Sequence, residues 1–179
     1  MKRLLALLAT GAALALSGCG QAADPPAQAD PTPSVSPTKA APTAPVMPDA
    51  ATQQTKAGAI AFARYYWRVV DYAQLSRDTD PLSALQTSRC RACDAGRKWI
   101  EQIDRRHGTI SGGQHRITAV EAHSDSGTGF IVFLRQSTSP QRVSGAGDLN
   151  NRYSGGRQHL VMNLSWASGW RVASWDTTD

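Results

Sequence analysis

Hydrophobic side chains between residues 56 and 108 recur at three- and four-residue steps, which is the period of amphipathic helices. The longest such run, residues 56–77, predicts a helix whose apolar face consists of Ala59, Phe62, Ala63, Tyr66, Val70 and Ala73. Residues 93–107 predict a second helix that stops before Gly108 and turns Ala95, Trp99, Ile100 and Ile103 toward the core. Asp80-Pro81 predicts a short helical turn between them, because Asp caps helices and Pro suits their first position.

Beyond residue 108 the pattern changes to that of strands. Residues 129–134 form a short apolar run that predicts a central strand. Residues 160–166 alternate strictly, which predicts one buried face, and residues 167–169 predict a hairpin loop into a strand over 170–175. The polar stretch 137–156, rich in Gly, Asn and Ser, predicts a long mobile hairpin loop. Helices followed by an antiparallel sheet predict the α+β class.

The first eighteen residues have the pattern of a secretory signal peptide. Lys2 and Arg3 precede an apolar run from Leu4 to Leu16, which is too short to span a bilayer comfortably. The ending Leu-Ser-Gly-Cys resembles a bacterial lipobox, in which cleavage makes the acylated Cys19 the new N-terminus. This resemblance implies an extracytoplasmic protein held on the cell membrane by a lipid. An ordinary signal peptide with a chance cysteine is the alternative.

Behind the Cys19 whose lipidation this resemblance implies, the composition predicts a disordered tether within residues 19–55 and a globular domain over residues 56–179. Eight of the ten prolines lie between Pro25 and Pro48, and all twelve aromatic residues lie between Phe62 and Trp175. A segment without aromatic residues buries too little apolar surface to offset its loss of conformational entropy. We therefore expect one folded domain behind a flexible linker.

The order of helices followed by a curved sheet resembles the nuclear-transport-factor-2-like (cystatin-like) cone. More specifically, the motifs Phe62-Ala63-Arg64-Tyr65-Tyr66-Trp67, Asp80-Pro81-Leu82 and Cys90-x-x-Cys93 resemble an actinobacterial lipoprotein family catalogued only as a domain of unknown function. The resemblance implies the fold and the location, and it supplies no catalytic residue.

The charge of the domain limits its partners. The whole chain carries a net charge of +5. A basic surface favours anionic lipid headgroups or acidic wall polymers, although ordinary surface solvation also explains such a charge. Nucleic acid is not an expected partner of an exported chain that has no nucleic-acid motif. The partners left open are an envelope protein, a wall polymer and a small apolar ligand, besides the membrane at Cys19.

The motif Cys90-x-x-Cys93 admits three chemistries. A thioredoxin-like redox pair sits at a helix start, but the strand-helix-strand surroundings of that motif are missing here. A zinc site needs two more ligands, and His107 and His115 have unusual spacing for one. Oxidising compartments favour a structural disulfide, which we expect here.

Enzymes on cone folds place an Asp, His or Tyr in the mouth of the sheet, which makes Asp71, Tyr72, His123 and His159 candidates. None belongs to a spaced catalytic constellation, so no catalytic residue, cofactor or metal is expected. The residues that could line a cavity are Tyr66, Asp71, Trp99, His123, Phe133, His159 and Met162. The sequence therefore favours a non-enzymatic binding or interaction module at the cell envelope. The alternative is an enzyme performing acid–base chemistry on a small apolar molecule in the cavity.

Overall fold

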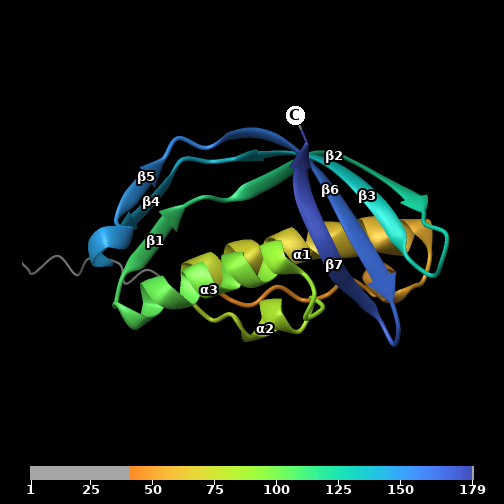
Figure 1. Ribbon diagram of the computed structural model, residues 1–179, viewed down its shortest axis with the longest axis horizontal. Helices are drawn as coiled ribbons and strands as arrows, with labels where there is room; N and C mark the ends of the chain where they lie inside the picture. Colours follow the sequence, from red (N-terminus) through yellow and green to blue (C-terminus); the bar gives the residue numbers. More distant parts are fainter. Residues whose placement is uncertain (1–40, 179) are drawn as a thin grey trace, which may run out of the picture. The chain divides into compact units, whose positions relative to one another are not determined.

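The computed structural model describes residues 41–178, in which two antiparallel sheets arch over three α-helices (Figure 1). The predicted α+β class is confirmed. The predicted signal peptide and the lipidation at Cys19 lie outside the described residues. Within residues 41–178, no helix combines the length and the apolar character needed to cross a bilayer.

The helices form close to their predicted positions. Helix α1 spans Lys56–Ser76 behind Thr55, whose hydroxyl accepts a hydrogen bond from the Gly58 N–H at 3.0 Å. Helix α2 spans Asp80–Ser83, and helix α3 spans Arg91–Arg105 with Cys90 at its N-cap.

The buried side of α3 agrees with the prediction at Ile100 and Ile103 and differs at Ala95. Cys93, Ile100 and Ile103 are buried, Trp99 is half-buried and Ala95 is exposed. Ala95 lies two positions beyond Cys93, which places it about 200° around the helix axis and away from the core.

The larger sheet has the strand order β2-β3-β6-β7. Its strands are β2 (His115–Ser124), β3 (Phe130–Thr138), β6 (Gly156–Trp166) and β7 (Trp170–Thr178). The predicted alternation in β6 is confirmed, since Leu160, Met162 and Leu164 are buried against the helices. The hairpin before β7 is also confirmed, with the pair Trp166 and Trp170 closing it.

The stretch predicted as a long loop, residues 137–156, instead supplies the end of β3, the start of β6 and most of a second sheet. That sheet has the order β1-β4-β5, from β1 (Thr109–Gly112), β4 (Gln141–Ser144) and β5 (Asn151–Tyr153), with a 3-10 turn η2 at Gly147–Leu149. The prediction was wrong because these strands are short and bury few side chains. Val143 is buried and Tyr153 packs edge-on against Trp99 of α3, with 6.3 Å between ring centres.

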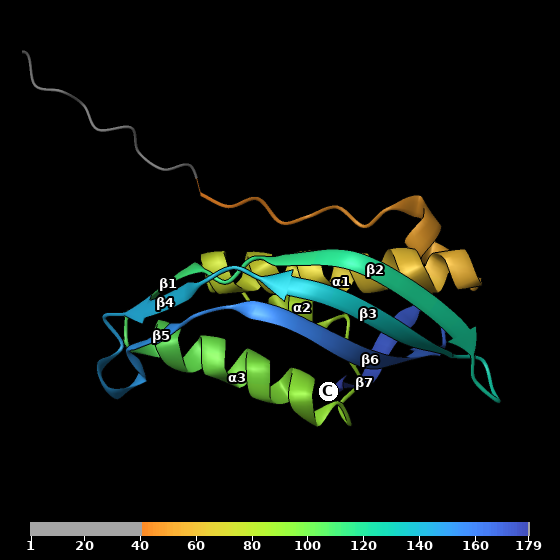
Figure 2. The same ribbon diagram turned by 90° about the horizontal axis from the view of Figure 1, so that it is seen from above.

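A crease separates the two sheets where β1 passes into β2, β3 into β4 and β5 into β6 (Figure 2). Gly112 and Gly155 sit on this crease with φ of +74° each. A Cβ at Gly112 would lie 2.0 Å from the carbonyl oxygen of Pro140, and one at Gly155 would lie 2.4 Å from that of Thr138. The tight bend therefore depends on residues without side chains.

The folded part begins earlier than predicted. Residues 45–53, assigned to the tether by composition, pack on α1 and β7 through a 3-10 turn η1 at Asp49–Thr52. Ala51 is buried, and the carbonyl oxygen of Gln53 accepts a hydrogen bond from Nε1 of Trp170 at 3.0 Å. A segment without aromatic residues is thus ordered by aromatic groups that the domain supplies, which explains why its own composition concealed this packing.

Candidate functional site

Five exposed arginines lie on the outer face of the sheets, the face turned away from the helices. The alternation along each strand puts them there, because side chains at successive positions point to opposite faces of a sheet. None of them has a carboxylate within ion-pair distance among residues 41–178. We call this set the arginine face: Arg116, Arg135, Arg142, Arg152 and Arg157.

Three members of the arginine face surround a hollow of about 680 Å³. In one cross-strand row, Ser137 lies between Arg116 and Arg157. In the next row, Arg135 lies between Ala119 and His159, and the small side chain of Ala119 leaves the space open. Adjacent strands are about 4.8 Å apart, so three guanidinium groups can reach one bound anion.

The remaining two members extend the positive charge across the crease. Arg142 and Arg152 face each other directly on β4 and β5. Like charges in this position repel each other unless an anion lies between or above them. A second hollow, of about 580 Å³, is lined by both Arg152 and Arg157. The exposed acids Glu121 and Asp176 lie one row beyond Arg135, so the positive surface ends there.

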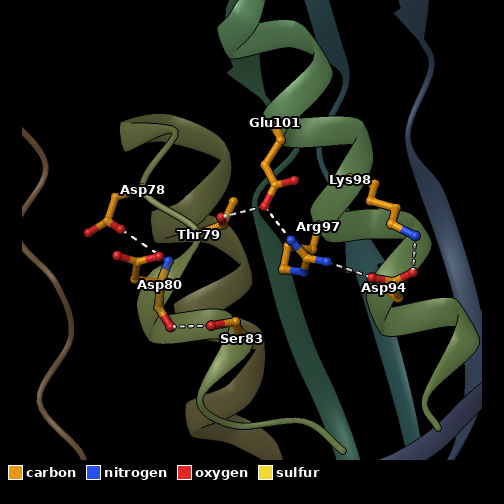
Figure 3. A network of polar contacts seen from close by, with 8 residues as sticks. All are labelled: Asp78, Thr79, Asp80, Ser83, Asp94, Arg97, Lys98 and Glu101. Atoms are coloured by element: carbon orange, nitrogen blue, oxygen red, sulfur yellow. Dashed lines mark hydrogen bonds and ion pairs between the residues drawn. The ribbon is translucent and has the colours of Figure 1, made fainter. Parts of the chain in front are cut away.

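On helix α3, in contrast, charged side chains form ion pairs with one another (Figure 3). On α3, Asp94 pairs with Arg97 and with Lys98, at 2.6 Å in each case, and Arg97 also pairs with Glu101. Hydrogen bonds from Lys98, and to a smaller extent from Arg97, hold the pKa of the Asp94 carboxyl below its usual value. Arg97 and Lys98 are thus neutralised within the chain, whereas the members of the arginine face are free for an external anion.

Asp71, one of the predicted candidates, makes a pair with His115 that the sequence did not indicate. Oδ1 of Asp71 lies 2.6 Å from Nδ1 of His115, and both carboxylate oxygens accept from the His115 backbone N–H at 3.1 and 3.2 Å. The ring of Trp67 covers the histidine with 4.6 Å between ring centres. This pair fastens the first residue of β2 to α1.

The other predicted cavity residues do not meet in one place. Tyr66 and Met162 are buried in the core. Burial raises the pKa of Tyr66 far above its usual value, and its hydrogen bond with Trp175 opposes this only in part, so its hydroxyl stays neutral. Tyr72 is half-buried and donates a hydrogen bond to Asp78 at 3.0 Å.

His123, Phe133 and His159 lie on the outer face instead. The side chains of His123 and Phe133 are exposed and their rings are 5.8 Å apart, while His159 lines the hollow beside Arg135. Their expected place in one cavity with Tyr66 and Met162 is therefore corrected. The reason is the register: each occupies a strand position that alternates with a buried neighbour, such as Leu134 beside Phe133.

Cys90 and Cys93 are joined by a disulfide with a sulfur–sulfur distance of 1.96 Å. Both side chains are buried at the start of α3, where Sγ of Cys90 accepts a hydrogen bond from the Cys93 N–H at 3.3 Å. The pair lies on the helical side of the domain and is no part of the arginine face.

Two parts of the site escaped the analysis of the sequence. The members of the arginine face are far apart along the chain, and no motif joins them. A signal did exist: Arg135, Arg157 and His159 stand at every second position of strands whose other positions are apolar or uncharged. His115 is separated from the pair Gly112-Gly113 by a single residue, and nothing in its neighbourhood pointed to Asp71, forty-four residues earlier.

One comparison with known proteins shows the family of this chain, and that family has no assigned function. Residues 30–165 match a family of unknown function (DUF6318). This match covers most of the chain, so the chain belongs to that family. A search of curated proteins found no match.

Proposed function

We propose that this member of a family of unknown function is a non-enzymatic binding module of the cell envelope that holds phosphate groups on its arginine face. The observation that carries the proposal is the absence of any internal counter-ion for Arg116, Arg135 and Arg157 among residues 41–178, although they surround one hollow. Arginine is suited to this task because its planar guanidinium forms paired hydrogen bonds with phosphate oxygens.

The location belongs to the same proposal. The lipobox-like Leu16-Ser17-Gly18-Cys19 supports lipid anchoring on the outer side of the membrane, as in the actinobacterial lipoproteins that the chain resembles. Anchoring would keep the arginine face near phosphate-bearing lipids and wall polymers. The arch of sheet over helices is also compatible with the nuclear-transport-factor-2-like cone, which we retain as a proposal.

Vesicle binding tests the phosphate proposal. The triple variant Arg116→Gln, Arg135→Gln, Arg157→Gln should bind phosphatidylglycerol vesicles about a hundredfold more weakly than the wild type, since each basic residue near an anionic surface contributes about 1 kcal/mol. The matched control removes three exposed, unpaired arginines of the helical side: Arg89→Gln, Arg91→Gln and Arg105→Gln. Co-sedimentation measures both.

The control variant shows whether vesicle binding depends on the arginine face or only on the net charge of the domain. Equal weakening in the two triple variants would refute the arginine face as a site. Soluble polyphosphate as a competitor distinguishes lipid headgroups from free phosphate chains as the ligand. It displaces the domain from vesicles only when a phosphate chain without a lipid is enough for binding. Unchanged vesicle binding by the first triple variant would also refute the proposal.

Anchoring is tested separately with the full chain expressed in a bacterium. We expect the wild type in the membrane fraction, released by detergent and not by high salt, and labelled by a radioactive fatty acid that Cys19→Ser does not take up. An unlabelled wild type, or equal labelling of Cys19→Ser, would contradict the lipid anchor and leave the phosphate test unaffected.

A further inference from the structure

A cleft of about 380 Å³ lies between α1, strand β2 and the docked N-terminal segment, apart from the arginine face. Helix α1 contributes Ala61, Arg64, Trp67 and Arg68, which lie along one side of the helix. Strand β2 contributes His115 and Ile117, and Pro48 closes the opposite side. Figure 2 shows how the N-terminal segment runs beside α1 and β2, so three segments distant in sequence build these walls.

The polar groups of this cleft are hydrogen-bond donors. Nε1 of Trp67 is buried, and no group in residues 41–178 accepts its hydrogen bond, although the Trp67 side chain itself lines the cleft. Arg64 and Arg68 are exposed and form no ion pair within the described part of the chain. His115 is the exception: its Nδ1–H donates to Asp71, which makes Nε2 the acceptor nitrogen of the neutral ring.

The cleft contains few hydrogen-bond acceptors. No carboxylate lines the cleft, and the nearest acid that the contacts define, Asp71, is already engaged by His115. A buried donor without an acceptor is unfavourable, so a ligand acceptor that reaches Nε1 after a small shift of the Trp67 ring relieves that cost. Two guanidinium groups without an ion pair in the described residues lie at the same opening, that of Arg68 over the ring of Tyr65 at 5.9 Å, and they favour an acceptor that is charged.

The other walls are apolar. Ala61, Ile117, Pro48 and the ring of Trp67 present hydrocarbon surface, and the volume is within the lower range for small-molecule sites. A purely inorganic anion would leave this surface in contact with water. A purely apolar molecule would leave the indole N–H unpaired.

We propose that this cleft binds a small amphipathic anion, with an acyl or aryl body between α1 and β2 and a carboxylate or phosphate group at Arg64, Arg68 and Trp67. Because Pro48 forms one wall, the bound molecule also holds the N-terminal segment on the domain. The site is independent of the arginine face, and neither proposal needs the other.

Calorimetry on residues 41–179 with four probes tests the cleft: octanoate, octyl phosphate, octanol and inorganic phosphate. We expect saturable binding of at least one eight-carbon anion, and at least tenfold weaker binding of octanol and of inorganic phosphate. A preference between octanoate and octyl phosphate identifies the headgroup. Failure of both eight-carbon anions to bind at millimolar concentration would overturn the proposal, and so would octanol binding as tightly as octanoate.

Variants place the binding in the cleft. The double variant Arg64→Gln, Arg68→Gln changes exposed side chains, and we expect it to fold normally by circular dichroism and to bind the anion at least tenfold more weakly. Trp67→Phe keeps a ring and removes the N–H, and it should weaken binding severalfold. Arg89→Gln, Arg91→Gln is the matched control that leaves affinity unchanged. Loss of binding in Arg135→Gln, with none in the Arg64/Arg68 variant, would move the anion to the arginine face and refute the cleft.

Discussion

At the scale of single residues, one glycine determines whether the N-terminal segment can lie on α1. Gly58 sits in the first turn of α1, where a Cβ would be 1.9 Å from the carbonyl oxygen of Gln53 and 2.9 Å from that of Ala50. Gly96, on α3, has no atom within 4 Å of the corresponding position. Gly58 is therefore required by the close approach of the N-terminal segment, whereas no such contact requires Gly96.

These two sites make a matched pair of substitutions. Gly58→Ala should lower the free energy of unfolding by about 1–3 kcal/mol, because the backbone of η1 must move away from the new methyl group. Gly96→Ala should raise it by about 0.5–1 kcal/mol, since alanine is the better helix former in open space. Urea unfolding measures both. A destabilising Gly96→Ala together with a neutral Gly58→Ala would contradict the packing described for η1.

Single residues also limited what could be predicted. Burial of Tyr65 and Trp67 escaped the helical pattern of α1, because α1 is covered on more than one side. The hydroxyl of Tyr65 donates to the carbonyl oxygen of Pro45 at 3.4 Å, and Trp67 lies between His115 and Trp175. Local periodicity reports one buried face, so contacts with a second layer need the tertiary structure.

At the scale of elements, α3 carries a charge network whose effect depends on pH. Asp94, in the first turn, is held by Lys98 and Arg97, and a negative charge there also suits the positive end of the helix dipole (Figure 3). The pKa of Asp94 is lowered in the folded state. Its stabilisation is complete above the unfolded-state value of about 3.9 and disappears as the pH falls through the lower folded value.

Asp94→Asn should therefore lose less stability than the wild type when the pH falls from about 5 to about 3. The two proteins should become closer in stability toward the acidic end, in urea unfolding at each pH. Asp176→Asn, at an exposed carboxyl without an ion pair in the described part of the chain, should follow the wild type. Parallel curves for Asp94→Asn and wild type would argue against a stabilising role of the ionised Asp94.

Elements also show where sequence patterns predict structure well. The central strands and the hairpin at residues 167–169 were predictable, because a strict alternation decides which face is buried. The strands β4 and β5 were not, because each has three or four residues and packs chiefly through Val143 and Tyr153. Of the candidate site, the sequence indicated the position of Asp71 near the apolar face of α1, while the row formed by Arg116, Ser137 and Arg157 depends on strand register.

At the scale of the whole domain, the connection between α2 and α3 covers the free edge of β7. The N–H of Val172 donates to the carbonyl oxygen of Leu85 at 2.9 Å, and the N–H of Thr87 donates to that of Val172 at 2.9 Å. The disulfide at Cys90 follows directly in the chain. An exposed strand edge invites pairing between molecules, and this connection closes part of it.

The N-terminal segment gives a prediction at the same scale. A chain starting at residue 54 should be less stable than one starting at residue 41 by about 3 kcal/mol, because it lacks the buried Ala51 and leaves Nε1 of Trp170 without its acceptor. Urea midpoints of the two fragments measure the difference. Equal midpoints would show that residues 45–53 contribute nothing to stability, and would restore the boundary expected from composition.

The docked segment also determines how force enters the domain. If the chain is held at Cys19, tension from the membrane reaches the hydrogen bond at Pro45 and the turn η1 before it reaches α1. The pulling force acts on these contacts one at a time, so each breaks separately. Paired strands share the force over several hydrogen bonds at once and therefore resist more tension. Under tension the segment would then detach first and add several residues to the linker. The paired strands β2, β3, β6 and β7 would stay folded.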